Sequence, residues 1–435
     1  MIETPTKWQA QMIIHSVGAY GQPPSWGFQF FSVGLEPYLQ VIEEDYLKGL
    51  VGHGGASFKV VVGPYGSGKT HFLYSVREIA FRQNYVVSYC SLSTKEKPFH
   101  KIDLVYKGVV SGLMKPVGPD ELLMGVEKGL EPFLKATVHE VAESLRSEDI
   151  GEDELKQRLY RFATDVTSGL DSYAFSKAMR AAIIALVDER FEDFESALQF
   201  LKGEGYDSTR HKQMGILEQF DEKHAFSMLR SLCRFVRNLR YQGIVVLFDE
   251  AENPAAMSTK QRELLNANLR EMIDQVAQSE FPFTMFFYAI PDEKQLTEGS
   301  RSPVLEALKQ RIRSVFGKAN PTGVQVRLAD IGKDPIPFMK QVGDRLCAIY
   351  EIAYDFPIPV EAKGRIVELV SQKVQEEAYG EESYKRTFVQ NLVKALNYYR
   401  AGEDKGPIDE IFIANALNER PGKQEEEEEE QDGRD

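Results

Sequence analysis

Residues 60–73 run Val60-Val-Val-Gly63-Pro64-Tyr65-Gly66-Ser67-Gly68-Lys69-Thr70-His71-Phe72-Leu73, and the rest of the chain is best interpreted outward from them. The loop from Gly63 to Thr70 fits the phosphate-binding pattern G-x-x-x-x-G-K-[S/T] at every fixed position. Glycines let a backbone aim its N–H groups at a phosphate, Lys69 supplies a cation for the β- and γ-phosphates, and the Thr70 hydroxyl suits Mg²⁺. Residues 57–62 are typical of a strand, and the apolar spacing after Lys69 is typical of a helix, whose positive N-terminal end favours an anion. A glycine-rich turn could match by chance, but strand, loop and helix all agree with the motif.

Length and composition favour a cytoplasmic protein built from two or three units of domain size. The chain has 435 residues, 43% of them hydrophobic. It contains no apolar run of about 18 residues that could span a membrane, and its first residues do not form a signal peptide. The three cysteines lack metal-ligand spacing and suit a reducing compartment; they are Cys90, Cys233 and Cys347. We therefore expect no membrane partner.

The charge distribution argues against general nucleic-acid binding. The net charge is −14, and residues 423–435 contribute −6 of it, from six Glu and two Asp against one Lys and one Arg. An acidic chain does not bind nucleic acid by default. A local basic face that binds nucleic acid is the alternative. The densest basic stretch contains Arg301, Lys309, Arg311, Arg313 and Lys318.

A second chemical motif ends a strand far along the chain. Residues 243–250 run Gly243-Ile-Val-Val-Leu-Phe248-Asp249-Glu250, an apolar strand followed by two carboxylates. Behind a matched phosphate loop, Asp249 is expected to hold Mg²⁺ through water and Glu250 to polarise the attacking water. The alternative is a core strand that ends in a solvated turn.

Apolar runs at 85–92, 283–290 and 323–329 predict three more strands, and residues 93–240 are almost wholly helical in pattern. Strands that are continuously apolar indicate a parallel sheet covered on both faces. We predict a helical lead-in (1–56), a nucleotide-binding domain (57–330) with a helical insertion at about 93–240, a helical lid (331–420) and a disordered acidic tail (421–435). The tail could instead contact a basic partner.

Together these features resemble the AAA+ class of P-loop ATPases, near its replication-initiator branch. Phe31-Ser-Val-Gly34 ahead of a helix resembles the adenine-side motif of that branch. The resemblance implies an α/β three-layer sandwich with a parallel five-stranded sheet, a long helical insertion and a C-terminal helical lid. More specifically, the chain is similar to ATP-binding proteins of the bacteriophage-exclusion (BREX) system, of the BrxD kind, up to about residue 418. The phrases that carry this similarity are Phe30-Phe-Ser-Val-Gly34, Val62-Gly-Pro-Tyr-Gly-Ser-Gly-Lys-Thr-His-Phe72, Lys101-Ile-Asp-Leu-Val-Tyr106, Tyr241-Gln-Gly-Ile-Val-Val-Leu-Phe-Asp-Glu-Ala-Glu252 and Arg386-Thr-Phe-Val-Gln-Asn-Leu-Val393.

The resemblance implies roles for residues at matching positions. Gly63, Pro64, Tyr65, Gly66, Ser67, Gly68, Lys69 and Thr70 bind the triphosphate, and Val33 and Gly34 lie on the adenine side. Thr70 and Asp249 hold Mg²⁺, and Glu250 is the catalytic base. Arg311 or Arg313 occupies the region of an arginine finger, and Arg386 resembles the second-sensor position. Each arginine could instead be a surface residue.

One departure from the AAA+ pattern leaves the function open. The fourth strand of that class ends in a small polar residue that helps to hold water, but here the end is Tyr288-Ala-Ile-Pro291. The first hypothesis is an ATPase of a defence system that couples ATP binding and hydrolysis to assembly or to remodelling of DNA or a partner. The second is a nucleotide-gated assembly scaffold with little hydrolysis, and a nucleotide kinase is a weaker third. Expected partners are ATP, other copies of the chain, other defence-system proteins and, as an open alternative, DNA.

Overall fold

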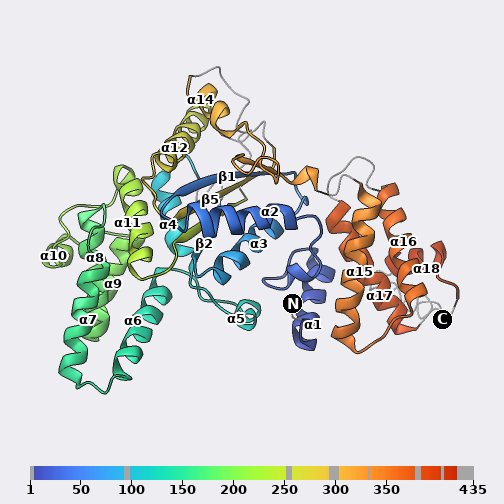
Figure 1. Cartoon of the computed structure of the whole chain (residues 1–435), viewed down its shortest axis with the longest axis horizontal. Coiled ribbons are helices and arrows are strands. Elements are labelled where there is room, and N and C mark those ends of the chain that lie inside the picture. Colours follow the sequence, from blue (N-terminus) through green and yellow to red (C-terminus); the bar gives the residue numbers. More distant parts are fainter. Residues whose placement is uncertain are drawn as a thin grey trace, which may run out of the picture. The chain divides into compact units, whose positions relative to one another are not determined.

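The computed structural model describes residues 4–92, 98–250, 257–292, 303–331, 334–377, 384–402 and 406–418. The chain forms two compact units, which are coloured along the sequence in Figure 1. The larger unit comprises Leu35–Ile331, and the smaller unit comprises Met1–Gly34 together with Gly332–Asp435. The predicted acidic tail, residues 421–435, and Arg301 of the basic stretch lie outside the described residues.

A mixed sheet of six strands lies at the centre of the larger unit. In chain order its strands are β1 (Ala56–Val62), β2 (Val86–Ser91), β3 (Leu113–Met114), β4 (Ile244–Asp249), β5 (Thr284–Ile290) and β6 (Gln325–Arg327). They pair in the order β3-β2-β4-β5-β1-β6, in parallel except that β3 runs antiparallel to β2. The prediction of a five-stranded, all-parallel sheet was therefore wrong. The five parallel strands are present, but the two residues of β3 add an antiparallel edge strand that is too short to leave an alternation in the sequence.

Twelve described helices belong to the larger unit. They are α2 (Glu36–Val41), α3 (Lys69–Arg82), α4 (Ile102–Ser111), α5 (Pro119–Met124), α6 (Leu130–Arg146), α7 (Glu152–Val166), α8 (Tyr173–Val187), α9 (Phe191–Lys202), α10 (Ser208–Gln213), α11 (Ala225–Asn238), α12 (Thr259–Ala277) and α14 (Pro303–Ile312). A π-helix (Ile42–Leu50) continues α2. Apart from β3, regular structure in the described residues between β2 and β4 is helical, as the sequence pattern predicts.

Aromatic contacts show that β5 is packed on both of its faces. Neighbouring residues of a strand point to opposite faces. On β5, the ring of Phe287 contacts Phe72 of α3. Tyr288, on the other face, contacts Phe248 of β4 and Phe99, which lies just before α4. Burial on both faces explains why the central strands are continuously apolar in sequence.

The helical insertion and the sheet share one hydrophobic core. Phe175 of α8, Leu198 of α9 and Leu232 of α11 belong to the same buried cluster as Val246 and Phe248 of β4. The insertion therefore packs on the sheet as part of the larger unit, and the burial of its apolar helix faces stabilises both.

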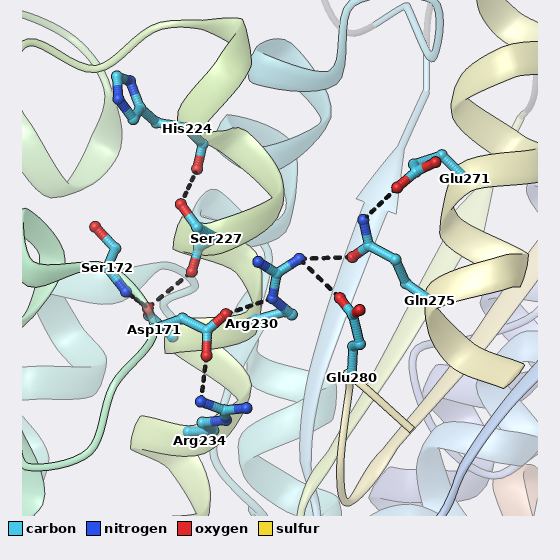
Figure 2. Close-up of polar contacts among 10 residues, drawn as sticks. Asp171, Ser172, His224, Ser227, Arg230, Arg234, Glu271, Gln275 and Glu280 are labelled. Atoms are coloured by element: carbon cyan, nitrogen blue, oxygen red, sulfur yellow. Dashed lines mark hydrogen bonds and ion pairs between the residues drawn. The ribbon is translucent and has the colours of Figure 1, made fainter. Parts of the chain in front are cut away.

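Arg230 of α11 links the insertion to α12 by polar contacts (Figure 2). Its guanidinium donates to the carboxylate of Asp171 at 2.5 Å and to the side-chain oxygen of Gln275 at 2.7 Å, and it lies 3.3 Å from Glu280. Asp171, just before α8, also accepts from Arg234. This network joins three segments that are far apart in sequence, so it fixes the position of α12 against the insertion.

A buried lysine holds the segment that joins α14 to β6. The side chain of Lys59, on β1, is only 2% exposed. Its ammonium donates to the Tyr46 hydroxyl at 2.6 Å and to the Gly323 carbonyl at 2.5 Å, and it faces the rings of Tyr46 and Phe316. The Tyr46 hydroxyl donates in turn to the carbonyl of Pro321 at 2.6 Å. Burial lowers the pKa of Lys59 to about 7.

The described part of the smaller unit is helical. Its helices are α1 (Lys7–His15), α15 (Pro335–Tyr354), α16 (Val360–Glu377), α17 (Tyr384–Ala401) and α18 (Glu410–Asn418). Thr6 and Gln9 form a capping box that starts α1. Gly343 lets α15 approach α16 closely, because a Cβ there would lie 2.7 Å from a methyl group of Val367. Within the described ranges of the chain, every helix is too short or too polar to cross a bilayer.

Candidate nucleotide-binding site

The loop between β1 and α3 folds tightly on itself just before α3, with the Ser67 N–H donating to the Pro64 carbonyl at 3.2 Å. Gly66 and Gly68 have φ values of 80° and 97°, a region that favours glycine. A Cβ added to Gly63 would lie 2.4 Å from the Ser67 hydroxyl oxygen, so this position has no room for a side chain. The loop thus brings its backbone close to the helix N-terminus, where amide groups and the helix dipole favour an anion.

The Lys69 side chain folds back over this loop. Its ammonium donates to the carbonyl of Gly63 at 2.6 Å and to that of Pro64 at 2.8 Å. It also lies 5.3 Å from the ring centroid of Tyr65, a side chain that is largely exposed. The structure therefore places the expected phosphate-binding cation against the loop.

Thr70 and Asp249 meet across the two motifs. The Thr70 hydroxyl donates to Oδ2 of Asp249 at 2.7 Å, although the two residues are 179 positions apart. The same oxygen accepts the phenol proton of Tyr89 at 2.5 Å, and Oδ1 accepts the backbone N–H of Glu250 at 2.8 Å. Asp249 ends β4 and is 1% exposed. A buried carboxylate needs such donors, and all of them here are neutral groups.

Glu250 follows directly in a turned backbone conformation. Its φ is +56°, which is uncommon for a residue other than glycine. Its carboxylate is exposed and accepts the hydroxyl proton of Ser91, the last residue of β2. The chain thus turns the second acid away from the first, so that one carboxylate is buried and the other faces solvent.

Tyrosine side chains next to Asp249 stay protonated. Burial raises the pKa of the Tyr89 phenol far above its usual value, and the charge of Asp249 raises it further. Burial also raises the pKa of Tyr74, whose ring centroid lies 5.3 Å from that of Tyr89. The guanidinium of Arg77 lies 4.4 Å from the Tyr74 ring centroid. The acid pair is therefore flanked by donors that do not ionise at neutral pH.

The oxygens at this place fit Mg²⁺. This ion prefers oxygen ligands and is usually bound by one or two protein groups together with substrate phosphates. Thr70 and Asp249 supply such a hydroxyl and carboxylate beside the phosphate loop. Among the residues that the structure describes, no group of three or more His, Cys, Asp or Glu could hold a metal by protein ligands alone.

A comparison with protein families decides what this site belongs to. The family model described as "BREX system ATP-binding protein BrxC/D" matches residues 6–412. The chain belongs to this family. The match includes both motifs, and the family description makes the chain an ATP-binding protein of the BREX defence system. No curated protein and no solved structure matches the chain.

The two candidate finger arginines of this BrxC/D protein have different surroundings. Arg311, on α14, donates to the carboxylate of Asp274 on α12 at 2.5 Å and to the carbonyl of Ala307 at 2.9 Å. Arg313, just beyond α14, is exposed, and no described residue pairs with it. Only Arg313 therefore presents its charge to solvent without an ion-pair partner among the described residues.

Three further predicted site residues of the BrxC/D protein belong to the smaller unit. Val33 and Gly34 follow Ser32, whose carbonyl accepts from Arg345 on α15. Arg386, on α17, is exposed and donates to the carbonyl of Gly21 at 3.1 Å. The nucleotide contacts expected of Val33, Gly34 and Arg386 stay predictions.

Sequence reasoning missed two residues of this BrxC/D site, Tyr89 and Ser91. Both lie on β2, which was interpreted only as a buried strand. A partial signal was present, because polar groups two positions apart lie on one face of a strand, but no strand order was predicted. The signal could be used only once β2 was known to pair with β4, with Ser91 opposite Asp249.

Proposed function

We propose that the larger unit of this BrxC/D protein binds and hydrolyses Mg²⁺·ATP as a P-loop ATPase of the AAA+ class. The observation that carries the proposal is the 2.7 Å hydrogen bond between Thr70 and Asp249, next to the loop that carries Lys69. It joins the two motifs that triphosphate chemistry requires. Thr70 and Asp249 would hold Mg²⁺ beside the loop, and the bound ion would supply positive charge that stabilises the charge developing on the phosphates.

The residues of the chain have distinct tasks in this proposal. Backbone N–H groups of the loop from Gly63 to Thr70, where only Pro64 has no N–H, bind the phosphates, and Lys69 exchanges its two carbonyl acceptors for phosphate oxygens. Glu250 orients a water and accepts its proton as the water oxygen bonds to the γ-phosphorus. The bond from that phosphorus to the bridging oxygen breaks, and ADP leaves. Val33 and Gly34 would line the adenine side.

The proposed assembly is a homo-oligomer in which Arg313 acts on the site of a neighbouring copy. Its exposure and its lack of a described partner favour it over Arg311, which is paired with Asp274. An arginine that reaches a γ-phosphate can supply several orders of magnitude in rate. Arg386 would sense the same phosphate from the helices after residue 331, which we propose to be a lid.

We propose that ATP turnover is coupled to assembly with other proteins of the BREX system or to remodelling of DNA or a partner protein. The large insertion between β2 and β4 offers surface for such contacts, and its core is continuous with β4, which carries the acids. Movement at the acids can therefore reach the insertion through packed side chains.

A nucleotide-gated scaffold with little hydrolysis is the second candidate, and one observation favours it. β5 ends at the buried Ile290 and is followed by Pro291, so the position that usually helps to hold the attacking water has an apolar side chain. Under this alternative, ATP binding orders the protein and turnover is rare.

ATP binding and phosphate release, measured on the full chain, test both candidates. Glu250→Gln should retain ATP and lose phosphate release, whereas Lys69→Ala should lose both. Glu263→Gln, at an exposed glutamate on α12, is the matched control and should behave like wild type. Undiminished release in Glu250→Gln would show that Glu250 is not the base. Full assembly with a non-hydrolysable analogue, without measurable release by wild type, would favour the scaffold.

A further inference from the structure

We propose that Tyr89 is a positioning residue for the metal-binding acid. Its phenol fixes the Asp249 carboxylate in the orientation that receives a divalent cation beside Thr70. This inference rests on the proposed function, and it assigns a cation-positioning task to a strand that lies outside both sequence motifs.

The hydrogen bonds around Asp249 leave its carboxylate little freedom. Oδ2 accepts from Tyr89 at 2.5 Å and from Thr70 at 2.7 Å, and Oδ1 accepts from the N–H of Glu250 at 2.8 Å. The Thr70 hydroxyl has two lone pairs, so it can present its oxygen to a cation while its proton still donates to Asp249. Tyr89 is the one side chain among the described donors to Oδ2 that the proposal does not also use as a cation ligand, so its hydrogen bond serves only to hold the carboxylate.

The register of the sheet explains why Tyr89 can reach this acid. β2 and β4 are parallel, with Tyr89 opposite Leu247 and Ser91 opposite Asp249. Paired residues point to one face, and residues two apart on a strand share that face. Tyr89 is therefore paired two residues before Asp249, and its side chain has to reach along the strands by that two-residue distance. A tyrosine is long enough to do this, whereas serine and threonine are too short.

The Tyr89 ring is held by groups other than the acid. Tyr74 of α3 packs against it with ring centroids 5.3 Å apart and an interplanar angle of 55°. The ammonium of Lys128, between α5 and α6, lies 5.8 Å from its centroid. The ring thus has supports on α3 and on the segment that leads into α6, so its hydroxyl is directed at Asp249 before a cation binds.

The geometry suits this task, because the Tyr89 hydroxyl donates to Oδ2 while Tyr74 packs against its ring. Donors that orient a metal ligand from behind typically change metal affinity by about 10- to 100-fold when they are removed.

The test removes one oxygen atom, that of the Tyr89 hydroxyl. Tyr89→Phe should raise the Mg²⁺ concentration for half-maximal ATP turnover by about 10-fold, while turnover at saturating Mg²⁺ changes little. Mn²⁺ binding to the protein with a non-hydrolysable ATP analogue, followed by electron paramagnetic resonance, should weaken by a similar factor. ATP binding without a divalent cation should not change. Melting temperatures establish that the variant is folded.

Tyr106→Phe is the matched control. The Tyr106 hydroxyl is buried and donates to the carbonyl of Leu201 at 2.7 Å, away from the acid pair, so the variant loses a comparable bond without touching the site. Equal Mg²⁺ and Mn²⁺ dependence in Tyr89→Phe, Tyr106→Phe and wild type would overturn the role of Tyr89 alone. A wild-type protein that binds ATP but shows no cation dependence would instead overturn the proposed metal site.

Discussion

Replacing Lys59 with methionine tests how the larger unit accommodates a cation in its interior. Methionine has nearly the length of the lysine stem but carries no charge. The variant loses two hydrogen bonds, to the Tyr46 hydroxyl and to the Gly323 carbonyl, and the contact of the ammonium with two aromatic rings. It also removes the free-energy penalty of burying a charge, and that penalty depends on pH.

The magnitude follows from the two pKa values of Lys59. Burial lowers the pKa from 10.5 to about 7, so between these values the unfolded chain binds one proton more than the folded chain. The free energy of unfolding therefore falls as pH is lowered from 10.5 toward 7, and it rises as pH is raised through the same range. Integration from pH 7 to pH 9 gives a rise of about 2 kcal/mol in the free energy of unfolding of wild type relative to Lys59→Met.

Urea unfolding at several pH values, followed by far-UV circular dichroism, measures this difference. Both tryptophans, Trp8 and Trp26, belong to the smaller unit, so tryptophan fluorescence serves as an internal control for that unit. Lys48→Met is the matched variant: hydrogen bonding to Glu44 raises the pKa of Lys48, so this residue is charged in both states from pH 7 to pH 9 and contributes no slope. If the free energy of unfolding of wild type relative to Lys59→Met stays constant or falls with rising pH, burial does not lower the pKa of Lys59.

Two further predictions concern the arginines. Arg313→Ala should lower phosphate release by the assembled protein on the order of 10³-fold without changing ATP affinity. Arg311→Ala should retain most of the activity, because Arg311 is already paired with Asp274. Equal losses in both variants would contradict this assignment. Arg230→Met should destabilise the contact between the insertion and α12 by about 1–3 kcal/mol, since it removes a mostly buried charge from three partners. Hydrogen exchange in α8 and α12 should become faster. Exchange rates unchanged from wild type would show that the network contributes little to stability.

Strands that are buried on both faces could be predicted from the sequence. Residues 244–248 are apolar throughout, residues 284–290 are apolar apart from Thr284 and the Tyr288 hydroxyl, and both strands lie buried in the middle of the sheet. The edges were harder to predict. β3 has only two residues, and β6 has three residues where a longer strand was expected, because Leu328–Asp330 forms a 3₁₀-helix. Such short edge pairings depend on neighbouring strands rather than on a local alternation.

The site shows the same division between local and long-range information. Gly63 to Thr70 could be identified because each position is constrained by the loop itself, as the crowded Cβ position at Gly63 shows. That Thr70 lies near Asp249 was inferred from the chemistry of triphosphates, and the structure brings the two side chains within hydrogen-bonding distance. Tyr89 could not be found in this way, because its task follows from strand order and register, which the sequence of one strand does not contain. The partner of Arg311 on α12 is likewise a tertiary contact.

A structure of the protein with Mn²⁺ and a non-hydrolysable ATP analogue would show whether the phosphate loop and Asp249 form one nucleotide site. We expect an anomalous metal signal about 2.1 Å from the Thr70 hydroxyl oxygen, with Asp249 reaching the ion through water. The β- and γ-phosphates should lie in the loop from Gly63 to Thr70, with Lys69 bonded to them instead of to the Gly63 and Pro64 carbonyls. A metal held away from Thr70 and Asp249, or a triphosphate bound outside this loop, would show that these residues do not form the nucleotide site.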